Sequence, residues 1–293
     1  MDNCEKFIYL LYIILNYLCY ILAIIFQIKS NIFFSISFHI IQFISSGLTI
    51  ITLKKTRNKP GYLDKEIEIK TTETKEIKPP IKTEEIAIYE SFPIMSFNLM
   101  PSNGCKLCEI TKLPLRSHHC SKCQKCVECF DHHSWILAGC VGENNRFKFI
   151  LFLLFQNISL ICSSFSTIKI INGQDNEIMA YFLTLLFSVI CLIEIIFFWI
   201  FAFHIYLLLT NQTTFELFNE DQCQYLAIFT FERNKILNLR GNSVDDSIRY
   251  QPFNSGIINN VYLFLKKMVE NDYIIDWEKI YFQNLKSSYE SKT

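Results

Sequence analysis

The chain has 293 residues, equal numbers of acidic and basic side chains, and a formal net charge of zero. Apolar residues make up 51% of it, and phenylalanine alone occurs 27 times. The balanced charge excludes a general attraction to nucleic acid, and the apolar residues gather in four long, almost uncharged blocks that an ordinary soluble domain does not have. We therefore expect an all-α polytopic membrane protein with four transmembrane helices.

The first two apolar blocks cover residues 7–26 and 32–53. About 20 residues of helix cross a hydrocarbon core of about 30 Å, so each block is long enough to span a membrane. The first block lacks the small-residue cleavage site of a signal peptide, and the second block follows it at once. We therefore expect residues 1–53 to hold transmembrane helices 1 and 2.

Basic residues follow the second block directly, at Lys54, Lys55, Arg57 and Lys59, whereas the other short connectors carry one lysine each. Positively charged loops tend to stay on the cytoplasmic side of a membrane. This pattern places the segment after span 2 in the cytoplasm, and four spans then put both termini there as well. The Lys, Glu and Thr content favours a polar cytoplasmic linker over residues 54–104.

Cysteine and histidine are concentrated between residues 105 and 140, which hold seven of the twelve cysteines and four of the six histidines. Thiols stay reduced in the cytoplasm, so this density indicates metal binding rather than disulfides. The cysteines form one CxxC pair and then two overlapping pairs, and with the histidines they supply ligands for two tetrahedral zinc sites. We therefore expect residues 105–148 to be a cytoplasmic domain, between spans 2 and 3, that holds two structural Zn²⁺ ions and gains folding energy from them.

A zinc-containing nucleic-acid reader is one alternative for this segment. The segment has neither the spacing of C2H2 fingers nor a strongly basic face, so we expect no nucleic-acid partner.

The stretch CFDHHSWILAGC, from Cys129 to Cys140, combines an aspartate, two histidines and a serine. Asp131, His132 and Ser134 have the residue types of a Ser-His-Asp nucleophilic site. The same residues also fit half of a zinc site, or a site that once held another cysteine. These three interpretations stay open on the residues alone.

The third and fourth apolar blocks cover residues 149–168 and 180–209, so we expect transmembrane helices 3 and 4 within residues 149–209. The fourth block is longer than a span requires, and its end, with His204, should leave the bilayer as a continuing helix. Glu194 lies well inside that block. An ionisable residue there is either functional or paired with a neighbouring helix.

The tail, residues 210–293, is expected to be cytoplasmic. Its segment 258–269 has the pattern of an amphipathic helix, which either lies at the membrane surface or packs on the rest of the protein.

The run from Cys105 to Phe149 resembles the cysteine-rich domain of the DHHC family of protein S-palmitoyltransferases. Those enzymes typically have four spans with this domain between spans 2 and 3, which agrees with the architecture expected above. Two motifs of the tail add to the resemblance. TTFE, with Thr213, Thr214 and Glu216, is similar to the family's TTxE motif, and Asn260 matches an asparagine that braces the transmembrane core.

The resemblance implies two zinc sites with three cysteines and one histidine each, and all eight positions are present. The first site would be Cys105, Cys108, His119 and Cys126. The second would be Cys120, Cys123, His133 and Cys140. One extra residue stands between Cys108 and His119, where the family has a shorter segment.

The family's signature is Asp-His-His-Cys, and here it reads Asp131, His132, His133 and Ser134. The resemblance implies that position 134 takes an acyl group from a fatty acyl-CoA such as palmitoyl-CoA, and that His132, oriented by Asp131, is the base. A serine must lose its proton as it attacks, whereas a thiol is easily ionised beforehand. Cys129 is the one cysteine of the cluster not needed as a ligand, and it is an alternative nucleophile.

Three hypotheses follow. The first is a DHHC-type palmitoyltransferase that moves a fatty acyl group from acyl-CoA to membrane-proximal cysteines of client proteins. The second is a catalytically silent relative that acts as a scaffold for clients, membrane lipid or a partner. The third is a membrane-tethered zinc adaptor. In each case we expect an integral membrane protein of the Golgi or endoplasmic reticulum.

Overall fold

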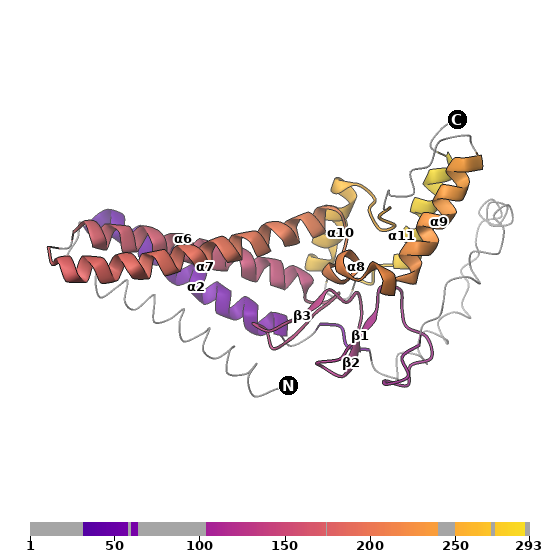
Figure 1. Ribbon diagram of the computed structural model, residues 1–293, viewed down its shortest axis with the longest axis horizontal. Helices are drawn as coiled ribbons and strands as arrows, with labels where there is room; N and C mark the ends of the chain where they lie inside the picture. The colour runs from indigo at the N-terminus through magenta and orange to yellow at the C-terminus, as the bar shows by residue number, and fades with distance from the viewer. Residues whose placement is uncertain are drawn as a thin grey trace.

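A computed structural model describes residues 32–57, 60–63, 104–173, 175–239, 250–270 and 273–290. Its long helices run side by side at one end of an elongated molecule, and short strands and C-terminal helices occupy the other end (Figure 1). The predicted first span, 7–26, and most of the predicted linker, 54–104, lie outside the described residues.

Three long helices form the first part: α2 (Ile32–Arg57), α6 (Arg146–Asn172) and α7 (Glu177–Leu209). α6 packs between α2 and α7. Each helix extends a few residues beyond the apolar block that predicts it, because polar and charged residues at a span's ends continue the helix outside the apolar stretch. The basic residues Lys54 and Lys55 therefore belong to the last turns of α2 and not to the linker.

Two of the described helices, α6 and α7, are long and apolar enough to cross a membrane. Most of the apolar window of α6 is buried against its neighbours, whereas that of α7 is mostly exposed. The exposed side chains of α7 include Phe182, Leu192 and Trp199. A large apolar surface of this kind is unfavourable in water and is typical of a helix in contact with lipid.

Polar side chains join the long helices to one another. Ser46 of α2 and Ser159 of α6 are 2.8 Å apart and share a hydrogen bond. Ser164 of α6 donates to Glu194 of α7 at 2.8 Å. Glu194 thus has a partner on a neighbouring helix, in agreement with the second of the two roles considered for it.

The cysteine-rich segment contains two short antiparallel hairpins that the all-α prediction omitted. β1 (His118–Cys120) pairs with β2 (Lys125–Val127), and β3 (His132–Ser134) pairs with β4 (Gly139–Val141). Strands of three residues have no alternating apolar pattern that sequence can reveal. The mostly helical class is correct, and the four strands are an addition to it.

The second hairpin is anchored to the long helices. Leu137 and Val141 pack in one buried cluster with Leu53 of α2, Phe152 of α6 and Phe197 of α7. Asn145, which is fully buried, accepts from the backbone N–H of Gly142 and donates to the carbonyls of Thr56 and Cys140. The cysteine-rich segment is therefore fixed at the ends of α2 and α6.

The C-terminal part consists of short helices around a second core. They are α8 (Thr214–Phe218), the 3₁₀ turn η1 (Glu220–Gln222), α9 (Gln224–Leu239), α10 (Ile257–Val269) and α11 (Trp277–Glu290). α11 packs on α9, and α10 packs on α7. α10 confirms the predicted helix over 258–269, with an apolar face that includes the exposed Ile258 and Tyr262.

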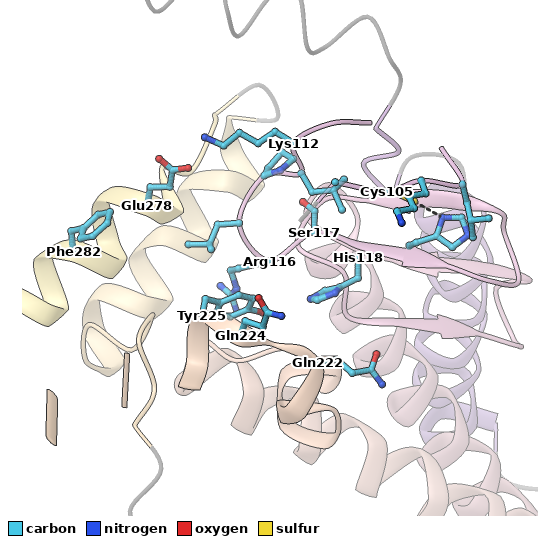
Figure 2. A pocket seen from close by; sticks show the side chains of 17 residues that line it. Cys105, Lys112, Arg116, Ser117, His118, Gln222, Gln224, Tyr225, Glu278 and Phe282 are labelled. Carbon is cyan, nitrogen blue, oxygen red and sulfur yellow. Dashed lines mark hydrogen bonds between the residues drawn. The ribbon is translucent and has the colours of Figure 1, made fainter. Parts of the chain in front are cut away.

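A cavity of about 390 Å³ separates the first CxxC loop from the C-terminal helices. Figure 2 shows Cys105, Lys112 and His118 on one side of it and Tyr225, Glu278 and Phe282 on the other. Its lining includes none of Asp131, His132 and Ser134. This cavity is thus separate from the residues expected to carry the chemistry.

Candidate functional site

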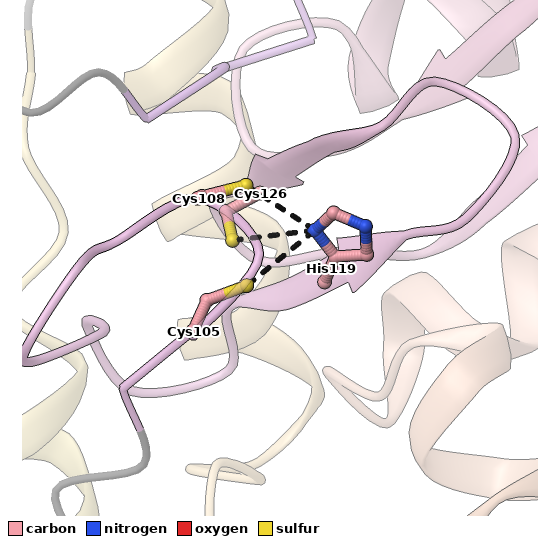
Figure 3. Close-up of side chains that lie close together, drawn as sticks. All are labelled: Cys105, Cys108, His119 and Cys126. Atoms are coloured by element: carbon pink, nitrogen blue, oxygen red, sulfur yellow. Dashed lines mark hydrogen bonds between the residues drawn. The ribbon is translucent and has the colours of Figure 1, made fainter.

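Cys105, Cys108, His119 and Cys126 lie together, with their ligand atoms within 4.8 Å of one another (Figure 3). The three sulfurs are 3.5, 3.3 and 3.9 Å from Nδ1 of His119. Zn–S bonds of about 2.3 Å and Zn–N bonds of about 2.0 Å at tetrahedral angles place sulfur and nitrogen about 3.5 Å apart. The four groups therefore have the spacing that one tetrahedral zinc ion requires.

Cys120, Cys123, His133 and Cys140 form a second group of the same kind. Their sulfurs are 3.6, 3.4 and 3.7 Å from Nδ1 of His133. Both donor sets, three thiolates and one imidazole, are of the type that holds structural zinc. The two clusters can each hold a zinc ion, and the structure brings together the ligand sets that the resemblance implies.

Both clusters follow one plan. In the first hairpin His119 is directly opposite Cys126, and in the second His133 is directly opposite Cys140. Each hairpin thus contributes a cross-strand pair of ligands. A CxxC loop supplies the other two, and Cys120 and Cys123 of the second cluster lie in the turn region of the first hairpin. The clusters are therefore interleaved.

Asp131 and His132 form a tight pair at the start of β3. Nδ1 of His132 lies 2.7 Å from Oδ2 of Asp131. Thr214, at the beginning of α8, donates its backbone N–H to Oδ1 and its hydroxyl to Oδ2, both at 2.9 Å. Because the carboxylate accepts from Nδ1, the other nitrogen of His132, Nε2, carries the lone pair of a neutral imidazole.

Asp131 is ionised although its side chain is completely buried. Burial raises the pKa of this carboxyl group, but the hydrogen bond and electrostatic interaction with His132 and the charge of Arg146 lower it by more, so that its pKa lies well below the ordinary value. Arg146 has its Nε 4.0 Å from Oδ1. The carboxylate is thus a fixed negative charge against which His132 is oriented.

Ser134 lies on the same side of β3 as His132, because side chains alternate along a strand and His133 between them points to the opposite side. Its hydroxyl is mostly buried and accepts a hydrogen bond from the backbone N–H of Leu137 at 3.4 Å. Among the described residues, no hydrogen bond joins it to His132. The His132 ring and the Ser134 hydroxyl therefore share a face of β3 without a hydrogen bond between them.

Cys129 occupies a different environment. It is 1% exposed and packs in the C-terminal core with residues such as Phe229 and Tyr281. Burial raises the pKa of its thiol well above the ordinary value. A thiol of this kind is poorly nucleophilic, so the geometry does not favour Cys129 as a relocated nucleophile.

The TTFE motif connects the cysteine-rich segment to the end of α7. Thr213 caps α8 in a reciprocal pair of hydrogen bonds with Glu216. Glu216 also forms a bidentate ion pair with Arg116, at 2.8 and 2.7 Å, and accepts from the hydroxyl of Tyr225 at 2.9 Å. Burial raises the pKa of Glu216, but the charge and hydrogen bonds of Arg116 lower it by more, so the carboxylate is ionised.

Arg116 is almost completely buried among the described residues. Its guanidinium packs against the rings of Phe253 and Trp277, at 4.1 and 4.3 Å from their centroids. It also donates to the carbonyl of Asn211 at 3.0 Å. Because Arg116 belongs to the zinc segment and its partners to the C-terminal part, this contact locks the two together.

Glu216→Gln should therefore lower the stability of the protein by about 3–5 kcal/mol, because it leaves the buried Arg116 charge uncompensated. Thermal unfolding of the purified protein in detergent measures this. Asp221→Asn, which removes the charge of an exposed acidic side chain five residues further on, is the matched control and should change the unfolding temperature little. Equal unfolding temperatures for the two variants would show that the ion pair does not hold the parts together.

Asn260 lies where the resemblance implies a bracing residue. Its side chain is 2% exposed and donates to the carbonyl of Leu209, the last residue of α7, at 2.7 Å. The helix that carries it begins after Gly256, whose φ of 90° is readily adopted only by glycine. Asn260 thus satisfies a carbonyl at the end of α7 that has no partner within that helix.

Two groups near Asp131 were not identified from sequence as site residues. Arg146 begins α6, and His204 lies near the end of α7 with its Nδ1 4.0 Å from Oδ2 of Asp131. No local motif surrounds either of them. The one available signal was a histidine near the end of an apolar block, where polar residues border the apolar stretch.

Residues 98–221 match the sequence model of the DHHC palmitoyltransferase family. The chain is 34% identical over 173 residues to a putative ZDHHC-type palmitoyltransferase 7 of Dictyostelium discoideum, which covers 55% of this chain and 34% of that protein. It is 29% identical over 179 residues to human palmitoyltransferase ZDHHC14, covering 57% and 34%. With zebrafish palmitoyltransferase ZDHHC15A the identity is 41% over 120 residues, covering 38% and 35%. The chain thus spans about a third of the length of these relatives.

The fold and the site together define a largely helical protein with two potential membrane spans and a two-centre cysteine-histidine segment beside an Asp-His pair. Residues 98–221 therefore match a DHHC palmitoyltransferase domain, and over these residues the resemblance seen in the sequence is confirmed.

Proposed function

We propose that this protein is a DHHC-type palmitoyltransferase that takes a fatty acyl group from acyl-CoA at a membrane and delivers it to cysteines of client proteins. The observation that carries the proposal is the Asp131–His132 pair, with residue 134 on the same face of β3 as the base. The family match over residues 98–221 supports it.

In the proposed reaction Nε2 of His132 removes the proton of the Ser134 hydroxyl as the oxygen attacks the thioester carbonyl of acyl-CoA. The C–S bond breaks, and the CoA sulfur leaves with the proton that His132 took. Ser134 then holds the acyl group as an oxygen ester. Asp131 keeps His132 in the correct tautomer throughout, through the contact at Nδ1.

The two clusters described above are the proposed zinc ligands: Cys105, Cys108, His119 and Cys126 in one, and Cys120, Cys123, His133 and Cys140 in the other. Zinc there would contribute folding energy and no chemistry at the acyl group, since all four positions of each site are filled by protein.

The proposed topology has four spans, with the zinc segment 105–148 in the cytoplasm between 1–53 and 149–209. The linker 54–104, the tail 210–293 and both termini lie on the same side. The basic residues at the end of α2 support this orientation. We place the protein in the Golgi or endoplasmic reticulum membrane, where α10 would lie at the lipid surface.

A second candidate function is that of a catalytically silent scaffold that binds clients, membrane lipid or a partner. The observation that favours it is the serine at position 134, whose hydroxyl has no hydrogen bond to His132 among the described residues. An oxygen ester is also less activated than a thioester, so transfer from Ser134 to a client thiol would be uphill.

Labelling with a clickable palmitoyl-CoA distinguishes the two functions. The enzyme is expected to become labelled, the label should resist neutral hydroxylamine as an oxygen ester does, and Ser134→Ala should abolish it. Label that hydroxylamine removes would place the acyl group on a thiol instead. Purified, folded protein that binds palmitoyl-CoA and takes up no label would contradict the enzyme and favour the scaffold.

A further inference from the structure

His204 lies beside the Asp131–His132 pair, although it comes from α7 and those residues come from the cysteine-rich segment. It is 3% exposed, and its Nδ1 is 4.0 Å from Oδ2 of Asp131. Its ring centroid is 5.4 Å from that of His132, and it meets the ring of Phe149 edge-on at 4.9 Å. Packing therefore holds a second imidazole against the carboxylate that orients the base.

The Nδ1 atom of His204 is buried and has no hydrogen-bond partner in the part of the chain that the structure describes. Buried polar atoms are nearly always hydrogen-bonded, and an exception calls for a physical reason. The charged group that this nitrogen faces is the Asp131 carboxylate. The lack of a hydrogen-bond partner for Nδ1 of His204 is thus explained if this nitrogen moves into hydrogen-bond distance of Asp131 at another stage of the reaction.

Oδ2 of Asp131 already accepts two hydrogen bonds, from His132 at 2.7 Å and from the Thr214 hydroxyl at 2.9 Å. A carboxylate oxygen has two lone pairs, so a further donor to Oδ2 has to share them in a longer contact. His204 is consequently a third donor that waits at longer range. Hydrogen bonds of catalytic groups are often long without substrate and shorten when it binds.

A metal ion held by Asp131, His132 and His204 is the competing explanation, because their ligand atoms also lie within 4.8 Å of one another. Two contacts oppose it. The Arg146 guanidinium, a fixed positive charge, lies 4.0 Å from Oδ1, and both carboxylate oxygens are already engaged by Thr214. A divalent cation would have to displace the threonine and approach the arginine.

We propose that His204 is a positioning residue for acyl transfer, an inference that rests on the proposed function of the same site. His204 acts through Asp131: its Nδ1–H holds the carboxylate in the plane that keeps Nδ1 of His132 engaged, which leaves Nε2 of His132 directed to the reacting residue at position 134. Two imidazoles on one carboxylate, one on a strand and one on a helix, fix the base relative to the membrane.

The test uses the full-length protein with Ser134→Cys, in which acyl loading is measured as a thioester. His204→Asn keeps an amide nitrogen near the place of Nδ1, His204→Gln moves it towards the place of Nε2, and His204→Leu removes it. We expect loading from palmitoyl-CoA to fall about tenfold with Leu and Gln and to change less than about twofold with Asn. Tyr206→Phe, on an exposed part of α7, is the control and should have no effect.

A second measurement does not depend on acyl-CoA. The thiol introduced by Ser134→Cys is alkylated with iodoacetamide at one fixed pH, and its rate is read from the corresponding peptide by mass spectrometry. The same order of His204 variants is expected, since the thiol is activated by the same base. If no variant is acylated but the alkylation rates follow this order, the proposed acyl transfer fails, whereas the positioning of His132 by His204 stands.

Two results would overturn the role of His204. If the thiol of the His204→Leu variant is alkylated and loaded as fast as that of the protein with histidine at position 204, then His204 does not act on the site. If the His204→Asn variant is alkylated and loaded as slowly as His204→Leu, while zinc content and solution behaviour are unchanged, the ring matters only for its packing against Phe149.

Discussion

Replacing Ser134 by cysteine is expected to raise the rate of self-acylation from palmitoyl-CoA by about 100-fold or more, the scale of what base assistance contributes to an oxygen nucleophile. A thiol with an ordinary pKa of about 8.5 is partly ionised before attack, and a neighbouring imidazole increases that fraction. His132 is already oriented by Asp131 to provide this effect. The initial rate of thioester formation, read as label that neutral hydroxylamine removes, measures the gain.

The larger sulfur atom fits at this position. Ser134 is directly opposite Gly139 in the second hairpin, so no cross-strand side chain competes for the space. The resulting thioester has about the energy of a client thioester, and onward transfer to a client cysteine should therefore appear together with loading. Ser134→Ala should show neither activity.

Adding Asp131→Asn to Ser134→Cys should remove most of the gain in self-acylation rate. An amide has no negative charge, so it does not hold His132 in the required tautomer as the carboxylate does. Failure of Ser134→Cys to load any acyl group, in protein that is folded and binds palmitoyl-CoA, would show that more than the nucleophile differs from an active site.

Loss of one zinc ligand is expected to unfold the cysteine-rich segment. Cys126 is a member of the first cluster and is completely buried in the middle of β2. Structural zinc contributes about 10–16 kcal/mol in small zinc domains, which is as large as the whole stability of many proteins. Cys126→Ala should therefore reduce bound zinc from two ions to one or none and make this segment sensitive to protease.

Cys129→Ala is the matched control, because Cys129 is a buried cysteine of the same segment that belongs to neither cluster. It should keep both zinc ions, as measured by elemental analysis of the purified protein. Loss of zinc in Cys129→Ala, or two ions retained in Cys126→Ala, would contradict the assignment of ligands.

The features that sequence predicted are those encoded locally. The helices α6 and α7 follow from long apolar runs, and the two clusters follow from the spacing of CxxC pairs together with the family resemblance. His119 and Cys126 are close in the chain, and one hairpin is enough to bring them together. Short-range patterns of this kind need no knowledge of the rest of the fold.

The features that sequence missed depend on distant contacts. Arg116 is a single basic residue in a polar stretch, and nothing near it indicates that Glu216, Phe253 and Trp277 will enclose it. In the sequence, His204 looks like a polar residue at the end of a span. Its place in the site becomes apparent only when α7 packs against β3 and α6. Pairings of this type are set by how the long helices assemble, which no local pattern records.

The alternation along β3 separates two tasks that neighbouring residues perform. His133 faces the second cluster, whereas the side chain at position 134 faces the other way and binds no metal. An exchange of sulfur for oxygen at residue 134 therefore leaves the metal frame intact and incurs little folding penalty. In evolutionary terms, a single substitution can exchange oxygen and sulfur at this position while both ligand clusters are inherited unchanged.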